Sequence, residues 1–279
     1  LVFNFTGVRQ VTIGNLASPL NIAAGIEARQ ENYSISAGET DSWINGGVLL
    51  PLGGIGCTTP TAQQILDGGC ATASGAQVFP GFRPANEVDE DRTAVGAYID
   101  LEAELTEKLL GSVALRLEDY SDFGSNVSGK IAMRYDFTES FALRASVQNG
   151  FRAPSLPQQY FATTSTNFIG GVPFDITTFP VSDPVAIALG AQPLDAEEST
   201  NCSVGAVINV GEVSITIDAY RIDIDDRIVL SENLTDPQVR NFLTSQGFIG
   251  VGGGRFFLNG VDTETEGLDI VVHWPFQSG

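Results

Sequence analysis

The chain has 279 residues, with 34 acidic against 14 basic side chains and a formal net charge of −20. This charge argues against nucleic-acid binding, which needs clustered Lys and Arg, and suits a solvated surface or a vestibule that attracts cations. Charged residues make up only 17% of the chain, and no run of about 18 apolar residues is present, so no transmembrane helix is expected.

Two strands are expected first, roughly at 2–13 and 19–35, and then a long segment of about 37–90. The chain opens in this strand-like pattern without an initiating Met or a basic leader, so we expect an internal piece of a longer protein. Cys57 and Cys70 lie in a Gly-, Thr-, Pro- and Ala-rich part of the long segment. Their spacing suits a disulfide that closes a surface loop in an oxidising compartment. Two unpaired loop thiols are the alternative.

Four further strands are predicted at 91–105, 109–121, 127–137 and 140–152, where apolar and polar residues alternate without a break. In the first of them Ile99 and Leu101 share one face and Asp100 and Glu102 the other. Each run lasts roughly ten residues or more, whereas soluble strands average about 5–6 and a tilted membrane strand needs about 9–11. Arg, Asp and Glu in mid-strand fit a wet lumen, so the pattern indicates the wall of an antiparallel, up-and-down transmembrane β-barrel.

The last strands are predicted at 198–210, 212–229 and 259–275, with Cys202 as a small buried group in the first of these three. Short turns alternate with the long segments 37–90, 153–197 and 231–258, which is typical of an outer-membrane barrel with long extracellular loops. Aromatic residues near strand ends, among them Tyr135, Phe137 and Phe141, weakly support this interpretation. Nine strands cannot close a single-chain bacterial barrel, which needs an even number, so a part of a larger wall is expected.

Three stretches resemble the barrel of TonB-dependent outer-membrane receptors. They are residues 126–161, with Gly150-Phe151-Arg152-Ala153-Pro154-Ser155 as the most specific part, residues 198–228 with Asp218-Ala219-Tyr220-Arg221, and residues 259–269. The resemblance implies a 22-stranded barrel in the outer membrane with an N-terminal plug domain. Such a receptor takes up ferric siderophores, haem, cobalamin or oligosaccharides, and the TonB complex drives release of the ligand. Residues 1–279 show neither a plug nor a closing strand, so they are interpreted as a partial barrel domain whose partners are lipid, plug and TonB.

The predicted polar face carries the candidate residues of a ligand pathway. Arginine can hold a carboxylate or phosphate with two parallel hydrogen bonds. The alternative is that the arginines neutralise Asp100, Glu102, Glu118 and Asp136 on adjacent strands, or bind the plug. The pathway candidates are Arg116, Arg134, Arg144, Gln148, Arg152 and Tyr160.

No metal, cofactor or catalytic site is expected. His273 is the only histidine, which excludes a His/Cys zinc cluster and a Ser-His-Asp triad within the chain. The acidic residues from Asp218 to Asp226 lack the glycine and distal Glu of an EF-hand, and are expected to pair with Arg221 and Arg227 instead. The glycines at 250–254 lack the context of a phosphate-binding loop and predict a flexible extracellular loop.

The second interpretation is a secreted or cell-surface β-sandwich that acts as an adhesive or carbohydrate-binding module. It predicts an apolar face that packs against a second sheet. The barrel predicts instead that this face contacts lipid, through residues Ile99, Leu101, Leu115, Ile131 and Leu143.

Overall fold

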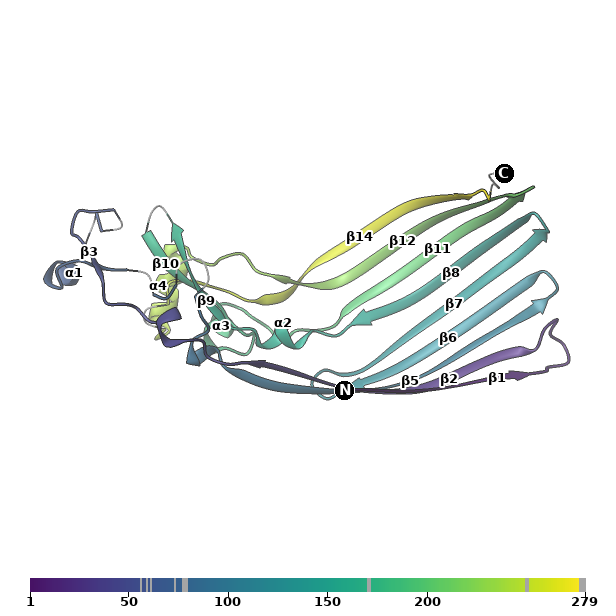
Figure 1. The fold of residues 1–279 in the computed structure, drawn as a ribbon, viewed down its shortest axis with the longest axis horizontal. Helices are drawn as coiled ribbons and strands as arrows, with labels where there is room; N and C mark the ends of the chain where they lie inside the picture. The colour runs from purple at the N-terminus through teal and green to yellow at the C-terminus, as the bar shows by residue number, and fades with distance from the viewer. Residues whose placement is uncertain are drawn as a thin grey trace.

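Nine strands form one antiparallel sheet in which neighbours in sequence are neighbours in space (Figure 1). The computed structural model describes residues 1–55, 57–58, 60, 62–72, 74–76, 80–169, 172–248 and 251–275. The nine strands are β1 (Val2–Val11), β2 (Leu20–Ile35), β5 (Val88–Thr106), β6 (Leu109–Tyr120), β7 (Gly124–Thr138), β8 (Phe141–Arg152), β11 (Glu197–Val210), β12 (Val213–Leu230) and β14 (Phe257–His273). All nine predicted strands are confirmed, with ends that differ by three residues or fewer.

The long connections carry short elements of their own. None of the helices in the described part of the chain is long and apolar enough to cross a membrane. The first connection holds η1 (Thr40–Ser42), β3 (Leu49–Leu50), α1 (Ala62–Leu66), β4 (Cys70–Ala71) and η2 (Pro84–Asn86). The other two hold α2 (Leu156–Tyr160), β9 (Thr163–Ile169), β10 (Val172–Thr178), α3 (Pro184–Ala188), α4 (Pro237–Ser245) and β13 (Gly254–Arg255).

The apolar face of the sheet is continuous from strand to strand. Val113 lies opposite Leu101 on one side and Ile131 on the other, and Ile131 in turn lies opposite Val147. Within the described residues, the only other sheets are the three-stranded β13-β10-β9 and the two-stranded β3-β4, both in the connections. The apolar side chains therefore stay open, with exposed fractions of 41% at Ile99, 44% at Leu115, 52% at Ile131 and 38% at Leu143. The β-sandwich interpretation is wrong, because no second sheet in the described part of the chain covers this face.

The height of the apolar face matches a bilayer. On β5 it runs from Val95 to Leu105, which is about 34 Å along the strand at about 3.4 Å per residue. At the tilt usual for membrane barrels this corresponds to a band about 25 Å tall. At its turn end Tyr135, Phe137 and Phe141 form a chain of ring contacts, with centroids 4.7 and 5.5 Å apart. Aromatic rings at this level are typical of a membrane interface.

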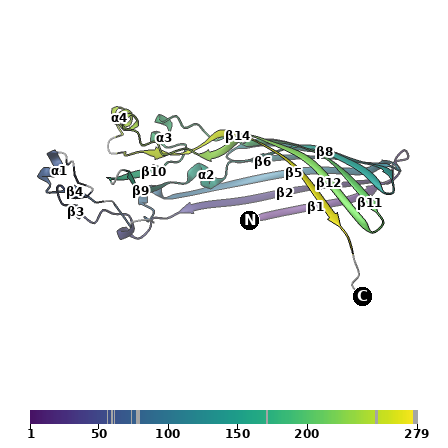
Figure 2. The same ribbon diagram turned by 90° about the horizontal axis from the view of Figure 1, so that it is seen from above.

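The sheet curves so that its β1 and β14 edges bend to the same side (Figure 2). On the polar face, side chains that are two strands apart touch. Arg144 on β8 reaches Asp218 on β12 across β11, and Tyr98 on β5 reaches Thr6 on β1 across β2. Side chains converge in this way on the concave side of a curved sheet and diverge on the convex side. The polar face is therefore the concave one, as expected for the lumen of a barrel.

The second and third long connections fold together at the end of the sheet opposite the short turns. β10 and β13 pair in parallel, although they come from different connections. Behind them Ala186, Ala191 and Phe256 form a small buried cluster. Gly254 and Arg255 are thus part of a strand, not of the flexible loop that was expected there, and Gly250 lies outside the described residues. We call this unit the loop module.

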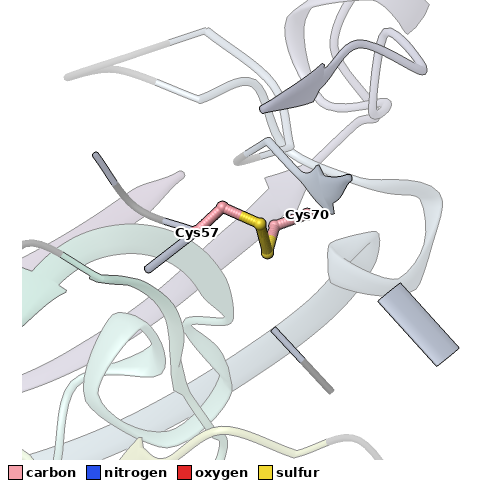
Figure 3. The surroundings of a disulfide bond; sticks show 2 residues. All are labelled: Cys57 and Cys70. Atoms are coloured by element: carbon pink, nitrogen blue, oxygen red, sulfur yellow. A yellow bond between two sulfur atoms is a disulfide. The ribbon is translucent and has the colours of Figure 1, made fainter. Parts of the chain in front are cut away.

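The structure joins Cys57 to Cys70 in a disulfide within the first long connection (Figure 3). Cys202 on β11 is free. The prediction that it is buried is wrong, because its register places it opposite Val147 on the convex face, where the described residues leave it exposed.

Candidate functional site

Acidic side chains of the wall hold the arginines of the concave face. The guanidinium of Arg116 lies 2.9 Å from Glu118 and 3.3 Å from Glu27. That of Arg134 lies 2.8 Å from Asp136. Glu118 and Asp136 were among the expected partners, but they were expected to pair across strands and each lies two residues along the same strand as its arginine. Glu27 was not expected, because it comes from β2, and only the three-dimensional register brings it near β6.

The two remaining arginine candidates are also paired. Arg144 donates to both carboxylate oxygens of Asp218, with its Nε 2.8 Å from Oδ1. Arg152 does the same with Glu197, with its Nε 2.8 Å from Oε2. Glu197 in addition accepts a hydrogen bond from the backbone N–H of Ile228, so it ties β8, β11 and β12 together. Each arginine candidate is thus pre-positioned by the wall itself.

Glycine in the intervening strand makes these long-range contacts possible. Gly205 lies directly between Arg144 and Asp218, and a Cβ there would come within 1.9 Å of the Asp218 carboxylate. Gly25 lies in the same way between Thr6 and Tyr98, whose hydroxyls are 2.6 Å apart.

The contact between Glu27 and Arg116 uses the same arrangement. Gly96 lies between Glu27 on β2 and Glu118 on β6, and the Arg116 guanidinium passes over it. A missing side chain on the central strand therefore allows partners two strands apart to meet on the concave face.

The best-buried cation of the wall was not anticipated from the sequence. Arg92 is 3% exposed and donates three hydrogen bonds to the carboxylate of Asp122 in the β6–β7 turn. It also donates to the carbonyl of Pro154 at 2.5 Å, and its guanidinium lies 5.5 Å from the centre of the Tyr120 ring. Arg92 therefore fixes the segment after β8 to the rim. The only indication in the sequence was that Arg92 occupies a polar-face position in the alternating pattern of β5.

Asp122 is held in its charged form. Partial burial opposes ionisation, but hydrogen bonds from Arg92 and Gln159 outweigh that effect and lower the pKa of Asp122 below its ordinary value. Gln159 belongs to α2, which begins at a capping box formed by Ser155 and Gln158 and contacts β5 and β2. The same carboxylate thus holds both the strand and the helix at the mouth.

Five of the six pathway candidates line three hollows along the concave face. Arg152 and Ser155 line the hollow nearest the loops, of about 490 Å³. Arg134 and Arg144 line another of about 480 Å³. Arg116 and Gln148 line a third of about 350 Å³. Tyr160 lines none of these three and stands at the end of α2, where burial raises the pKa of its hydroxyl.

The chain forms an open, curved sheet with long loops at one end. Its convex face is apolar over the height of a bilayer, and its concave face is polar. These features define the chain as a wall segment of an outer-membrane β-barrel. A family model described as the TonB dependent receptor-like beta-barrel matches residues 19–278. The chain belongs to the TonB-dependent receptor family, whose members are outer-membrane proteins of Gram-negative bacteria.

Two curated relatives match parts of the chain. The vitamin B12 transporter BtuB of Vibrio cholerae is 37% identical over 70 residues, which are 25% of this chain and 11% of the transporter. The ferric enterobactin receptor PirA of Pseudomonas aeruginosa is 29% identical over 135 residues, 47% of this chain and 17% of that receptor. These relatives are transport receptors, not enzymes, in agreement with the expectation that this chain is not a catalyst.

Solved structures share the fold. The siderophore receptor PirA of Acinetobacter baumannii superposes with a TM-score of 0.60 at 15% identity, over 99% of this chain and 34% of that one. The ferric enterobactin receptor PfeA of Pseudomonas aeruginosa gives 0.62 at 14% identity, over 100% and 33%. The chain thus spans about a third of the length of these solved receptors, and the likeness concerns the fold alone.

Proposed function

We propose that this chain forms part of the wall and mouth of a receptor that imports a scarce iron chelate, a ferric siderophore, across the outer membrane. The family match over residues 19–278 carries the proposal, and the ferric enterobactin receptor is the curated relative that covers the larger share of the chain. In this proposal Arg152 and Tyr160 at the mouth contact the ligand first, and Arg116, Arg134, Arg144 and Gln148 line its path through the barrel.

The proposal also includes the remaining barrel strands, a plug domain and the TonB complex. The nine strands would form part of a closed barrel, since an open sheet edge is not tolerated in lipid. A plug domain would fill the concave side, and the TonB complex would supply the energy for release. Both partners are inferred from the family to which the chain belongs.

Cobalamin is the second candidate ligand. The vitamin B12 transporter matches a shorter part of the chain than the ferric enterobactin receptor does, but at higher identity. The two ligands differ in a way that an experiment can use. Ferric enterobactin is an anionic chelate, whereas vitamin B12 is large and carries little net charge.

Binding of the two ligands to the full-length receptor in detergent micelles decides between them. We expect saturable binding of ferric enterobactin, and weaker binding in an Arg152→Ala variant. Arg221→Ala is the matched control, since Arg221 pairs with acids on the convex face and should leave binding unchanged. Saturable binding of vitamin B12 alone would favour the second candidate, and binding of neither would contradict ferric enterobactin and cobalamin as the ligands.

A further inference from the structure

The convex face carries an apolar hollow near the end of the sheet where the short turns lie. The hollow has a volume of about 270 Å³ and is lined by apolar side chains of β5, β6 and β7 and of the β1–β2 hairpin. Two small residues, Ala103 and Gly111, lie opposite each other at its floor, and Ala103 is only 3% exposed. The hollow therefore follows from small residues in a band of otherwise large side chains.

A β-bulge forms one wall of the hollow. The register shifts between Glu104 and Thr106, so Leu105 has no partner on β6. Its side chain leans toward Gly111, where a new Cβ would come within 3.1 Å of the Leu105 Cδ1. A bulge redirects a side chain in this way. The position of Leu105 is thus set by the backbone of β5.

The β1–β2 turn forms the opposite wall. The backbone N–H of Ala17 donates to the carbonyl of Glu104 at 2.9 Å, and the N–H of Glu104 donates to the Ser18 hydroxyl at 2.9 Å. These bonds hold the turn against the end of β5, and Leu16 of the same turn lines the hollow. Both walls are therefore fixed by backbone contacts within this chain.

The hollow faces lipid whatever else completes the barrel. A plug domain would fill the concave side, and further strands would continue the sheet at its β1 and β14 edges. Neither covers the convex face of β5, β6 and β7. The hollow also lies within the apolar band, because Leu101, Val113 and Ile131 line it and form the next row of that band. Its occupant is therefore the hydrocarbon of the membrane.

The hollow lies at the level of one leaflet. Short turns of outer-membrane barrels face the periplasm. Leu109 lines the hollow and lies opposite Tyr135, which belongs to the chain of aromatic rings at the interface. Glu107 and Lys108 form the turn just beyond this level, and Lys108 is about 10 Å along the chain from Gly111 at about 3.4 Å per residue. An anion and a cation thus stand where the lipid headgroups of the periplasmic leaflet lie.

We propose that this hollow holds one acyl chain of a phosphatidylethanolamine-type lipid of the periplasmic leaflet, with its phosphate on Lys108 and its ammonium on Glu107. Such a headgroup carries both charges that the two-residue turn can pair. An acyl chain gains no hydrophobic free energy when it moves from bulk lipid into an apolar hollow, so the preference for this place comes from packing and from the headgroup. The lipid site does not depend on which ligand passes through the barrel.

Photo-crosslinking in a bilayer tests the site. The full-length receptor is reconstituted in phosphatidylcholine vesicles that contain a small fraction of phosphatidylethanolamine with a diazirine in the middle of one acyl chain. Labelled peptides are quantified by mass spectrometry. We expect residues 101–105 of β5 to be labelled about fivefold more than residues 202–206 of β11, which share the convex face but not the hollow. An excess of unlabelled phosphatidylethanolamine should remove the difference, and phosphatidylglycerol, which lacks the ammonium, should remove less of it.

Variants of the hollow and of the turn make the test specific. Gly111→Leu should lower labelling of β5 to the level of β11, because it fills the hollow and only the tip of Leu105 lies within 4 Å of the new Cβ. Ala145→Leu is the matched control, since it adds the same side chain beside Met133 but outside the hollow, and should have no effect. Glu107→Gln and Lys108→Gln should each reduce the excess about threefold, as expected for one exposed ion pair.

Equal labelling of β5 and β11 in the natural receptor would overturn the proposal, because bulk lipid alone gives that result. An excess that Gly111→Leu leaves unchanged would overturn it as well. If Gly111→Leu does not assemble, the turn variants decide, because both leave the hollow intact. An unchanged excess in both of them would contradict the headgroup contacts and with them the site.

Discussion

At the residue scale, Arg92 and Asp122 fasten the mouth of the wall. Arg92 is nearly fully buried, and it links the β6–β7 turn to the carbonyl of Pro154. The sequence pattern placed Arg92 on the concave face but could not single it out, because its partners lie 30 and 62 residues further along the chain. The same holds for Arg116 and Arg144. Their face was predictable, but Glu27 and Asp218 follow only from the register.

Arg92→Ala should loosen the segment 153–161. Removal of one partner of a buried pair leaves Asp122 uncompensated, at a cost of about 3 kcal/mol. We expect faster hydrogen exchange in 153–161 and little change in β7 and β8. Arg134→Ala is the control, because the Arg134–Asp136 pair is largely exposed and should be worth less than about 1 kcal/mol. Equal effects of the two substitutions would contradict the anchoring role.

The stability that the Arg92–Asp122 pair gives to the segment 153–161 should depend on pH. The pKa of Asp122 lies below its ordinary value in the folded protein, so its contribution is fully present above that ordinary value and is lost as the pH falls through the lowered one. Exchange in 153–161, corrected for intrinsic rates, should therefore rise as the pH drops below about 4. In Asp122→Asn the segment should already be loose at neutral pH, with no further change on acidification.

At the element scale, strands and loops differ in how far sequence defines them. The nine strands were predictable because each carries a long two-residue period, and the short turns between them fix the order. The loop module was not predictable. β10 and β13 are short, lack a clear period and pair residues that are 77 positions apart in the chain, such as Thr177 and Gly254, so no local signal joins them. Cys202 was predicted in the right strand but as a buried group, and it is exposed because a membrane wall exposes the apolar face that a soluble sheet buries.

Gly205 tests how β8, β11 and β12 are coupled. Gly205→Ala should displace the Arg144–Asp218 pair, since the new Cβ would overlap the carboxylate. The pair is partly exposed, so the expected loss of stability is modest, about 0.5–1 kcal/mol. Chemical unfolding should show this loss in the natural background and not in Asp218→Ala, which removes both the ion pair and the side-chain atoms that the new Cβ would overlap. The control is Gly129→Ala, where the nearest atom would be 3.6 Å from the new Cβ.

At the scale of the whole molecule, the two faces of the sheet meet different solvents. Leu115 lies near the middle of the apolar band, so Leu115→Arg should cost about 2–4 kcal/mol and reduce assembly into the outer membrane. Ser112→Arg on the concave face is the matched control, because its register neighbour is Glu102 and the new charge is favourable there. The fraction of folded barrel in each variant is measured by heat-modifiable migration in gel electrophoresis. An equal loss of folded barrel in the two variants would argue against a lipid-facing band.

A spin-label scan along β5 tests the central claim most directly. Single cysteines are placed from Val95 to Leu105 in a Cys202→Ser background, and the full-length receptor is reconstituted in lipid bilayers. Accessibility to oxygen should exceed accessibility to a water-soluble nickel complex at Val95, Ala97, Ile99 and Leu101, and fall at the positions between them, with a period of two residues. Uniform accessibility, or a preference for the nickel complex at Ile99 and Leu101, would contradict the account of this chain as a membrane wall.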